Sequence, residues 1–423
     1  MSEPLRFIHC ADLHLDCPLG GLTELPDSLA QKARKATFSA FGKLIDEAIA
    51  RAVDFVVIAG DIFNSKDKSL RAQLKFRDGM ARLDEAGIEV FIVHGNHDPL
   101  DGWAAEIAMP PNVHRFGGDV VECVPFLRNG NEAARVYGIS YPHQAVHDNL
   151  AAQFVLDNKN VPAIAVLHCL VGGTTGHERY APTTKEELLA SGFDYWALGH
   201  VHTKAVINDN HPAVVYPGNI QGLHRNEIGE RGCYLVEMDE SRGCRLEFIS
   251  LDCLRYEHVT VDISDVSDLA DVIENILVAC RERISAVDSI VTVELAGRSI
   301  LNRQLRRDSY MSVLLEQLRE KLDAGNPLIR IESLRVRTVS VHDIDTLRGR
   351  EDFIGGVLAV FDSLDDFASE GRQEFLSTLQ ETFSGWDGAA YVLMPDDDEL
   401  PRLLDEARQR IIDELLEESG DAD

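Results

Sequence analysis

Apolar residues in the first half of the chain follow two alternating patterns. Short, almost wholly apolar runs predict five strands, at residues 5–9, 55–59, 90–93, 163–167 and 195–198. Residues 29–52 and 70–86 instead repeat apolar side chains at helical spacing. Continuous Val- and Ile-rich strands separated by helices indicate a sheet that is covered on both faces.

The remaining elements are predicted from shorter runs. Residues 214–216 and 232–237 have no helix between them, which favours antiparallel edge strands. Farther along, helical spacing and strand alternation follow each other, with helices at 267–284 and 308–323 and strands at 289–295 and 328–341. We therefore predict three parts: an α/β domain at 1–255, a smaller α/β domain at 256–345 and a helical region at 346–423.

Polar side chains follow the five predicted strands, at the point where each strand ends. They are Asp12 and His14, then Asp61, then Asn96 and His97, then His168, and finally His200 and His202. Ligands in open α/β sheets bind beyond the carboxyl ends of the strands, so we expect these side chains to meet at one rim. Carboxylate, imidazole and amide oxygen together suit manganese, iron or zinc. Each cluster alone is a weak signal, whereas five in order are highly specific.

The stretches that carry these residues have a family resemblance. They are IHCADLHLD at 8–16, AGDIF at 59–63, VHGNHDP at 93–99 and YPGNIQG at 216–222. They resemble the calcineurin-like metallophosphoesterase superfamily, and the whole chain resembles its SbcD-type DNA repair nuclease subunits, in particular the YhaO-like branch. The resemblance implies an α/β fold: a four-layer β-sandwich flanked by helices, with a smaller α/β capping domain and C-terminal helices.

The resemblance also implies two divalent metal ions, usually Mn²⁺, bridged by Asp61. The other ligands would be Asp12, His14 and His202 for one ion, and Asn96, His168 and His200 for the second. A water between the ions would be the nucleophile. His97 would act as general acid for the leaving oxygen, with Asp98 orienting its ring. Asn64 departs from the family, which often has Asp there, so we expect altered hydrogen bonding near the metals.

The charge balance bears on the substrate. Acidic residues outnumber basic ones 71 to 41, for a net charge of −30, so the protein is unlike a non-specific DNA-coating protein. A DNA substrate therefore needs local basic groups. The candidates are a strip of Lys66, Lys68, Arg71, Lys75 and Arg77, a cluster of Arg298, Arg303, Arg306 and Arg307, and the pair His224 and Arg225. The strip is equally typical of a solvated helix face.

Localisation and partners are expectations at this stage. No apolar run reaches the roughly 18 residues of a membrane span, no secretory signal precedes residue 5, and the eight cysteines contain no Cys-x-x-Cys pair. We expect a cytoplasmic protein. A charged helix from Asp396 carries an apolar stripe that would pack on the capping domain or on a partner. The resemblance implies an SbcC-like coiled-coil ATPase as partner, and a possible homodimer formed through the helices that follow Asp12 and Asp61.

Three functions remain open from the residues. The leading interpretation is a manganese-dependent DNA exo- or endonuclease that works with an ATPase subunit. The second is a stand-alone phosphodiesterase or phosphatase acting on a small nucleotide or a phosphoprotein. The third is a scaffold that kept the fold without the chemistry, which the retention of His97 and all seven ligands disfavours.

Overall fold

The computed structural model describes residues 3–365, except 21, 23–24, 68, 104, 106, 173–179, 285, 340 and 342–343, and also residues 374–375, 377–378, 382 and 400–420. The chain forms two compact units. The first comprises Met1–Glu257, Ile284–Val291 and Asn326–Glu332, and the second comprises His258–Arg283, Thr292–Gly325 and Ser333–Asp423.

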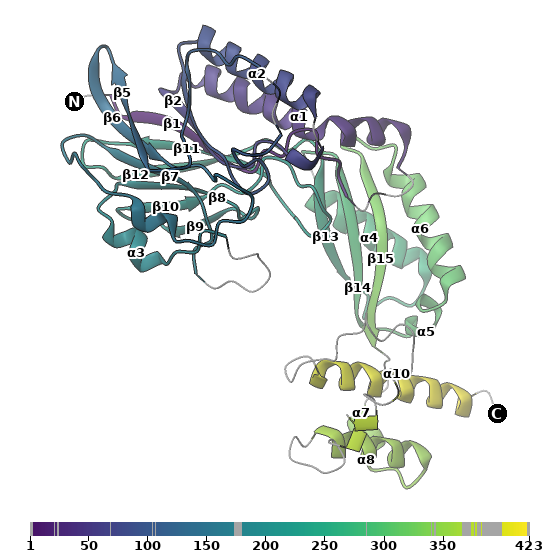
Figure 1. Ribbon diagram of the computed structural model, residues 1–423. Coiled ribbons are helices and arrows are strands. Elements are labelled where there is room, and N and C mark those ends of the chain that lie inside the picture. The colour runs from purple at the N-terminus through teal and green to yellow at the C-terminus, as the bar shows by residue number, and fades with distance from the viewer. Residues whose placement is uncertain are drawn as a thin grey trace. The chain divides into compact units, whose positions relative to one another are not determined.

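Two six-stranded sheets form the centre of the first unit (Figure 1). One has the order β12-β11-β1-β2-β3-β4, with β1 (Leu5–Cys10), β2 (Phe55–Ala59), β3 (Glu89–Val93), β4 (Val113–Arg115), β11 (Gly232–Met238) and β12 (Cys244–Ser250). The other has the order β5-β6-β7-β8-β10-β9, with β5 (Glu122–Arg128), β6 (Asn131–Gly138), β7 (Ala163–His168), β8 (Tyr195–Gly199), β9 (Ala205–Asn208) and β10 (Ala213–Tyr216).

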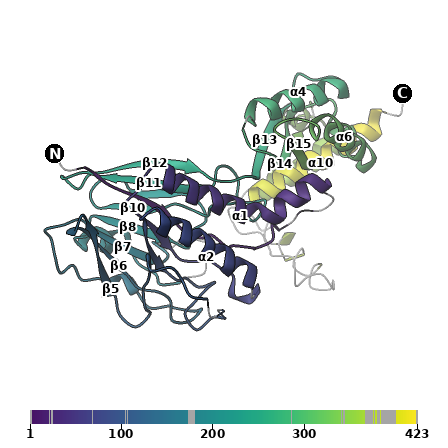
Figure 2. The same ribbon diagram turned by 90° about the horizontal axis from the view of Figure 1, so that it is seen from above.

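The side chains of these strands separate into three apolar layers. Helices α1 (Asp27–Ala50) and α2 (Leu70–Glu85) lie on the same side of the first sheet and cover its outer face (Figure 2). Alternate residues of the same strands, such as Phe7 and Phe55, face the second sheet. The outer face of the second sheet packs against residues 139–156 and α3 (Lys185–Ala190). Helices, two sheets and a further outer layer give the predicted four-layer sandwich, so the expected fold is confirmed.

Most strands and helices predicted from the apolar pattern are present in the first unit. The five apolar runs are strands β1, β2, β3, β7 and β8, all interior to their sheets, and the two long helical patterns are α1 and α2. The prediction of antiparallel edge strands at residues 214–216 and 232–237 was wrong in part. β11 pairs antiparallel with both β1 and β12, so it is an interior strand. β10 pairs antiparallel with β9 but parallel with β8, so it is an interior strand, and β9 forms the edge.

A three-stranded sheet follows the sandwich in the chain, in the order β13-β14-β15. Its elements are β13 (Arg255–Asp262), α4 (Leu269–Arg283), β14 (Ser289–Arg298), α5 (Asn302–Leu305), α6 (Asp308–Leu322) and β15 (Ile329–Val339). The strand-helix-strand-helix-strand sequence agrees with the pattern predicted for a small α/β domain. The two compact units divide the strands of this sheet, so the limits at residues 255 and 345 stay a prediction.

The C-terminal helices pack on one another. Leu404 and Ile412 of α10 (Leu400–Gly420) are buried against Leu358 of α8 (Phe353–Asp365) and its neighbours, together with α7 (Ile344–Arg348). Ile411, expected in the apolar stripe, is 40% exposed. Leu404, Ala407 and Leu415 of the expected stripe do pack on these helices, with Ile412 in place of Ile411, so the surface that covers the stripe comes from the C-terminal region itself. The expected helix start at Asp396 lies outside the described residues, and among the described helices none is long and apolar enough to cross a membrane.

Candidate metal centre

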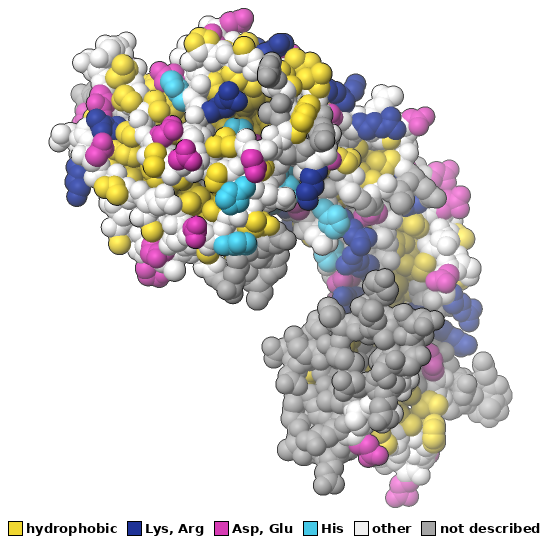
Figure 3. All heavy atoms as spheres, in the orientation of Figure 1, with side chains coloured by type: hydrophobic (Ala, Val, Ile, Leu, Met, Phe, Trp, Pro, Cys, Tyr) yellow, Lys and Arg dark blue, Asp and Glu magenta, His cyan; other side chains and the backbone are white. Residues whose placement is uncertain are grey.

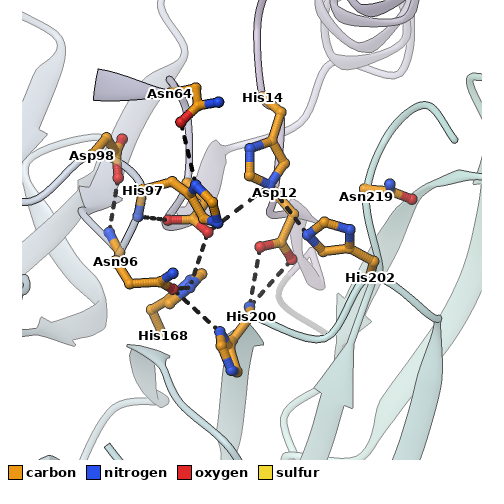
Figure 4. Close-up of polar contacts among 12 residues, drawn as sticks. Asp12, His14, Asn64, Asn96, His97, Asp98, His168, His200, His202 and Asn219 are labelled. Atoms are coloured by element: carbon orange, nitrogen blue, oxygen red, sulfur yellow. Dashed lines mark hydrogen bonds and ion pairs between the residues drawn. The ribbon is translucent and has the colours of Figure 1, made fainter. Parts of the chain in front are cut away.

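Parallel strands bring the predicted site residues to one edge of the sandwich. Asp12, Asp61 and Asn96 lie just beyond β1, β2 and β3 of the first sheet, which are mutually parallel. His168 is the last residue of β7, and His200 follows its parallel neighbour β8. All five converge on one centre together with His14 and His202. Figure 4 shows this arrangement for the ligand candidates that it labels. The rim predicted from strand ends is thus present, built from both sheets.

Glycines let these side chains approach the backbone. A Cβ atom on Gly95 would lie 2.4 Å from Asp61 Oδ1 and 2.7 Å from His168 Nε2. A Cβ atom on Gly199 would lie 1.8 Å from the carbonyl oxygen of Ala59. All three distances are far below normal contact, so only glycine fits at either position.

The backbone at this edge is held in a rarely populated conformation. Four site residues other than glycine have positive φ: Asp12 (52°), His14 (40°), Asp61 (53°) and His200 (95°). The Asp12 amide donates to Gly60 O (3.0 Å) and the His14 amide to Asp61 O (3.0 Å), which stabilises the turn after β1. Each such residue costs of order 1–3 kcal/mol, and strain of this kind clusters at functional sites.

Hydrogen-bond acceptors face one another around His168. Its Nδ1–H donates to Ala59 O (2.9 Å), so Nε2 of the neutral ring carries a lone pair. That Nε2 lies 3.0 Å from Asn96 Oδ1 and 3.3 Å from Asp61 Oδ2, which are acceptors as well. Asn96 Oδ1 is also 3.3 Å from His200 Nδ1. Such a convergence of acceptors is stable only when protons or cations lie among them.

The same arrangement recurs around His14. His14 Nε2 lies 3.1 Å from His202 Nε2 and 3.9 Å from Asp61 Oδ2. His202 Nδ1 is 2.6 Å from Glu227 Oε1, so Nδ1–H donates there and Nε2 is left as an acceptor. Two groups have ligand atoms that all lie within 4.8 Å of one another: Asp12, His14 and His202, and Asp12, Asp61 and His168. The donor set therefore fits two divalent cations.

Ionisation at this edge is strongly perturbed. Burial raises the pKa of Asp12 to about 6, although His168 and His202 oppose the shift. Burial lowers the pKa of His14 to about 3. For His168 burial would also lower the pKa, but the adjacent Asp61 carboxylate outweighs it and raises the value to about 9. Burial raises the pKa of Asp61 as well, yet the surrounding His168, His14 and His97 hold it below its usual range. Without metal, the negative charge of the clustered Asp12 and Asp61 carboxyl groups is thus offset by protons held on Asp12 and His168.

His97 lies at the edge of this group. Its backbone amide donates to Asp61 Oδ1 (2.9 Å), its ring packs edge-on against the His14 ring, and its Nδ1 is 3.3 Å from Asn64 Oδ1. The side chain is part-exposed, next to a pocket of about 240 Å³ that Lys66 and Gln144 also line. The position where the family often has Asp is thus the one that contacts the His97 ring.

Asp98 does not have the role expected from the sequence. Its Oδ2 accepts from the Ile62 amide (2.9 Å) and lies 3.2 Å from His94 Nδ1, while Oδ1 accepts from the Gly95 amide (2.9 Å). The carboxylate therefore ties together the loops that carry Asp61 and Asn96, and Asn64 orients the His97 ring in its place.

The remaining polar residues divide between surface and core. His224 and Arg225 are exposed in the loop between β10 and β11, and the Asn226 amide donates to His224 Nδ1 (3.3 Å). His9 is fully buried between Tyr195 Oη (2.9 Å) and Leu198 O (3.2 Å), so it is structural. His177 and Lys68 lie outside the described residues. Glu227 was missed, because no spacing or motif connects it to His202.

The fold and the donor set define a class of metal-dependent phosphoesterase. Residues 5–204 match the calcineurin-like phosphoesterase family. Residues 256–339 match the middle domain of the metallophosphoesterase YhaO.

Several curated relatives agree with this assignment. An uncharacterized metallophosphoesterase YhaO from Bacillus subtilis is 39% identical over 269 residues, which cover 64% of this chain and 66% of that protein. DNA double-strand break repair proteins Mre11 from Methanopyrus kandleri and Methanococcus maripaludis are 25% and 31% identical. Those matches cover 62% and 55% of this chain, and 60% and 63% of the relatives. The chain thus spans somewhat less than two thirds of the length of the relatives it matches.

Proposed function

We propose that this protein is a two-metal phosphodiesterase that hydrolyses DNA phosphodiester bonds as an SbcD-type nuclease subunit. The observation that carries the metal-dependent chemistry is the convergence of acceptor atoms from five strand ends, which fits a pair of divalent cations. The DNA substrate is supported by the relatives named as Mre11 DNA repair proteins. An SbcC-like coiled-coil ATPase partner and a homodimer belong to the same proposal.

Each residue has a role in this proposal. Asp61 Oδ2 lies 3.9 Å from His14 Nε2 and 3.3 Å from His168 Nε2, so it would bridge the cations. One cation would be held by Asp12, His14 and His202, and the other by Asn96, His168 and His200. Two divalent cations such as Mn²⁺ would supply Lewis acidity and a nucleophilic water at neutral pH. The imidazole and carboxylate mixture is compatible with manganese.

His97 is the proposed proton donor to the leaving oxygen. Nδ1 faces Asn64 Oδ1, so its hydrogen would donate there, and the proton for the leaving oxygen would be carried on Nε2 of the doubly protonated ring. The amide bond to Asp61 fixes His97 relative to the proposed bridging ligand. The pocket beside its ring would receive the leaving part of the substrate, where Lys66 is an exposed cation.

The surface gives the DNA proposal only local support. Basic and acidic side chains are interspersed on the face of the first unit seen in Figure 3. Arg71 of the basic strip is 3.4 Å from Asp16 and lies over the Phe38 ring, so part of its charge is engaged within the protein. The negative net charge favours a second candidate, a phosphodiesterase for small substrates that need no extended basic surface.

Cleavage assays separate these candidates. The purified protein with Mn²⁺ would be incubated with linear DNA and, in parallel, with bis(p-nitrophenyl) phosphate. A DNA nuclease should cleave DNA with a rate that depends on its length, whereas turnover of the aryl ester alone would favour the small-substrate function. His97→Ala should retain metal and lose about 10²–10⁴-fold in rate, and Asp61→Ala should lose both. Cleavage by His97→Ala at the parent rate would remove the proton-donor assignment.

A further inference from the structure

The loop between β10 and β11 places a carboxylate behind one of the candidate ligands. Glu227 is largely buried, and its Oε1 lies 2.6 Å from His202 Nδ1. Its Oε2 accepts from Asn219 Nδ2 (2.9 Å) and from the Leu223 amide (2.6 Å). Both carboxylate oxygens are thus used, so the position of this side chain is fixed from two directions.

The loop holds the backbone of His202 as well as its ring. The His202 carbonyl accepts from the Asn219 amide (3.1 Å) and from the Arg231 guanidinium. A Cβ atom on Gly218, whose φ is 77°, would lie 2.6 Å from the same carbonyl oxygen, so the chain passes directly over it. Ring and backbone of His202 are therefore positioned by one segment, residues 218–231.

We propose that Glu227 is the positioning residue that makes His202 a ligand for the cation held with Asp12 and His14. The hydrogen bond to Nδ1 selects the tautomer whose Nε2 lone pair faces His14 Nε2, 3.1 Å away. A carboxylate on the far nitrogen of a metal-binding histidine fixes the ring and increases its basicity. This inference rests on the metal centre of the proposed function and is independent of the DNA substrate.

Metal titration tests the proposal without any turnover. Mn²⁺ would be titrated by calorimetry into metal-free parent protein, Glu227→Ala, Glu227→Gln and a control, Glu230→Gln. Glu227→Ala should weaken one of two binding events about 10–100-fold and leave the other unchanged. Glu227→Gln should lose less, because its amide oxygen can still accept from His202 Nδ1–H. Glu230 is a surface residue that pairs with Lys204 (3.3 Å) and Arg255 (3.8 Å), so its variant should bind like the parent.

A double-mutant cycle with His202→Ala separates positioning from general structural support. If Glu227 acts through His202, adding Glu227→Ala to His202→Ala should weaken Mn²⁺ binding by no more than about threefold further. An equal loss at both binding events, or the full loss in the His202→Ala background, would overturn the proposal. If Glu227→Ala does not fold, the smaller and site-selective loss in Glu227→Gln decides the question in the same background.

The outcomes also distinguish this inference from the proposed function. A parent protein that binds no Mn²⁺ would contradict both the Glu227 inference and the proposed two-metal function. A parent protein that binds two Mn²⁺ ions yet leaves DNA intact would remove the substrate proposal alone, and the Glu227 cycle would still be decisive.

Discussion

Replacing Asp12 by Asn should stabilise the metal-free protein while abolishing metal binding. Asp12 is 1% exposed and stands among other acceptors; the His200 amide donates to both of its oxygens at 3.2 Å. Asn keeps the size of the side chain and one acceptor for that amide but removes the negative charge. The gain in stability and the loss of metal therefore have one cause, the electrostatic repulsion that a cation would otherwise neutralise.

The magnitude follows from the ionisation of Asp12. Burial raises its pKa from 3.8 to about 6. Well below pH 3.8 the carboxyl is protonated in the folded and unfolded states, so ionisation costs nothing. As the pH rises to 6 the unfolded chain releases its proton first, and above pH 6 the folded state bears a constant cost of about 3 kcal/mol. Because His168 and His202 lose a favourable neighbour in the variant, we expect a net gain of about 1–3 kcal/mol at pH 8.

Urea unfolding with EDTA at pH 8 and pH 4.5 measures this gain. Asp12→Asn should unfold at higher urea than the parent at pH 8, and the difference should shrink at pH 4.5. Asp194→Asn is the matched control, since Asp194 is also 1% exposed but accepts from the Ala163 amide (2.8 Å) and pairs with His211 (2.7 Å). That variant should lose about 1–3 kcal/mol. A comparable loss in Asp12→Asn at pH 8 would refute the reasoning.

Three further predictions concern the metal centre. Asn64→Ala should lower kcat about tenfold or more with Mn²⁺ affinity unchanged, because Asn64 contacts only the ring of His97 among the proposed catalytic groups; a parallel loss of affinity by calorimetry would contradict this. Gly95→Ala should weaken Mn²⁺ binding by at least tenfold, because the added methyl group would lie 2.4 Å from Asp61 Oδ1; parent-like affinity would refute the close packing. Mn²⁺ affinity should increase between pH 6 and 9, since binding must displace protons held by Asp12 (pKa about 6) and His168 (pKa about 9); calorimetry in buffers of different ionisation enthalpy would detect the released protons, and a pH-independent affinity would exclude them.

The sequence was sufficient to predict which side chains converge because strand ends are local features. Asp12, Asp61 and Asn96 each follow an apolar run, and parallel pairing then brings them to one edge. It was insufficient for contacts that depend on loop conformation. Glu227 reaches His202 across 25 residues, and Asp98 turns toward backbone amides where a ring contact was expected.

Two errors in the fold have similar physical causes. Residues 214–216 were expected at a sheet edge because no helix separates them from residues 232–237, yet their parallel pairing with β8 involves strands 18 residues apart. The apolar stripe of α10 is present at Leu404, Ala407 and Leu415, but Ile412 packs in place of Ile411, because both are apolar and only tertiary packing selects between them. Apolar pattern thus predicts that a helix is buried on one side, while its exact orientation depends on the surface that covers it.

The hydrogen bond from His168 Nδ1 to Ala59 O has a consequence for how the protein tolerates mutation. It crosses the seam where the two sheets meet, so the distance between the metal-facing groups is set by how the sheets are registered against each other. Any substitution that slides one sheet along its partner, even in the Phe7 and Phe55 layer, would change the spacing of the two cations. If the proposed metal centre is catalytic, substitutions in that distant layer should therefore change activity as well as stability.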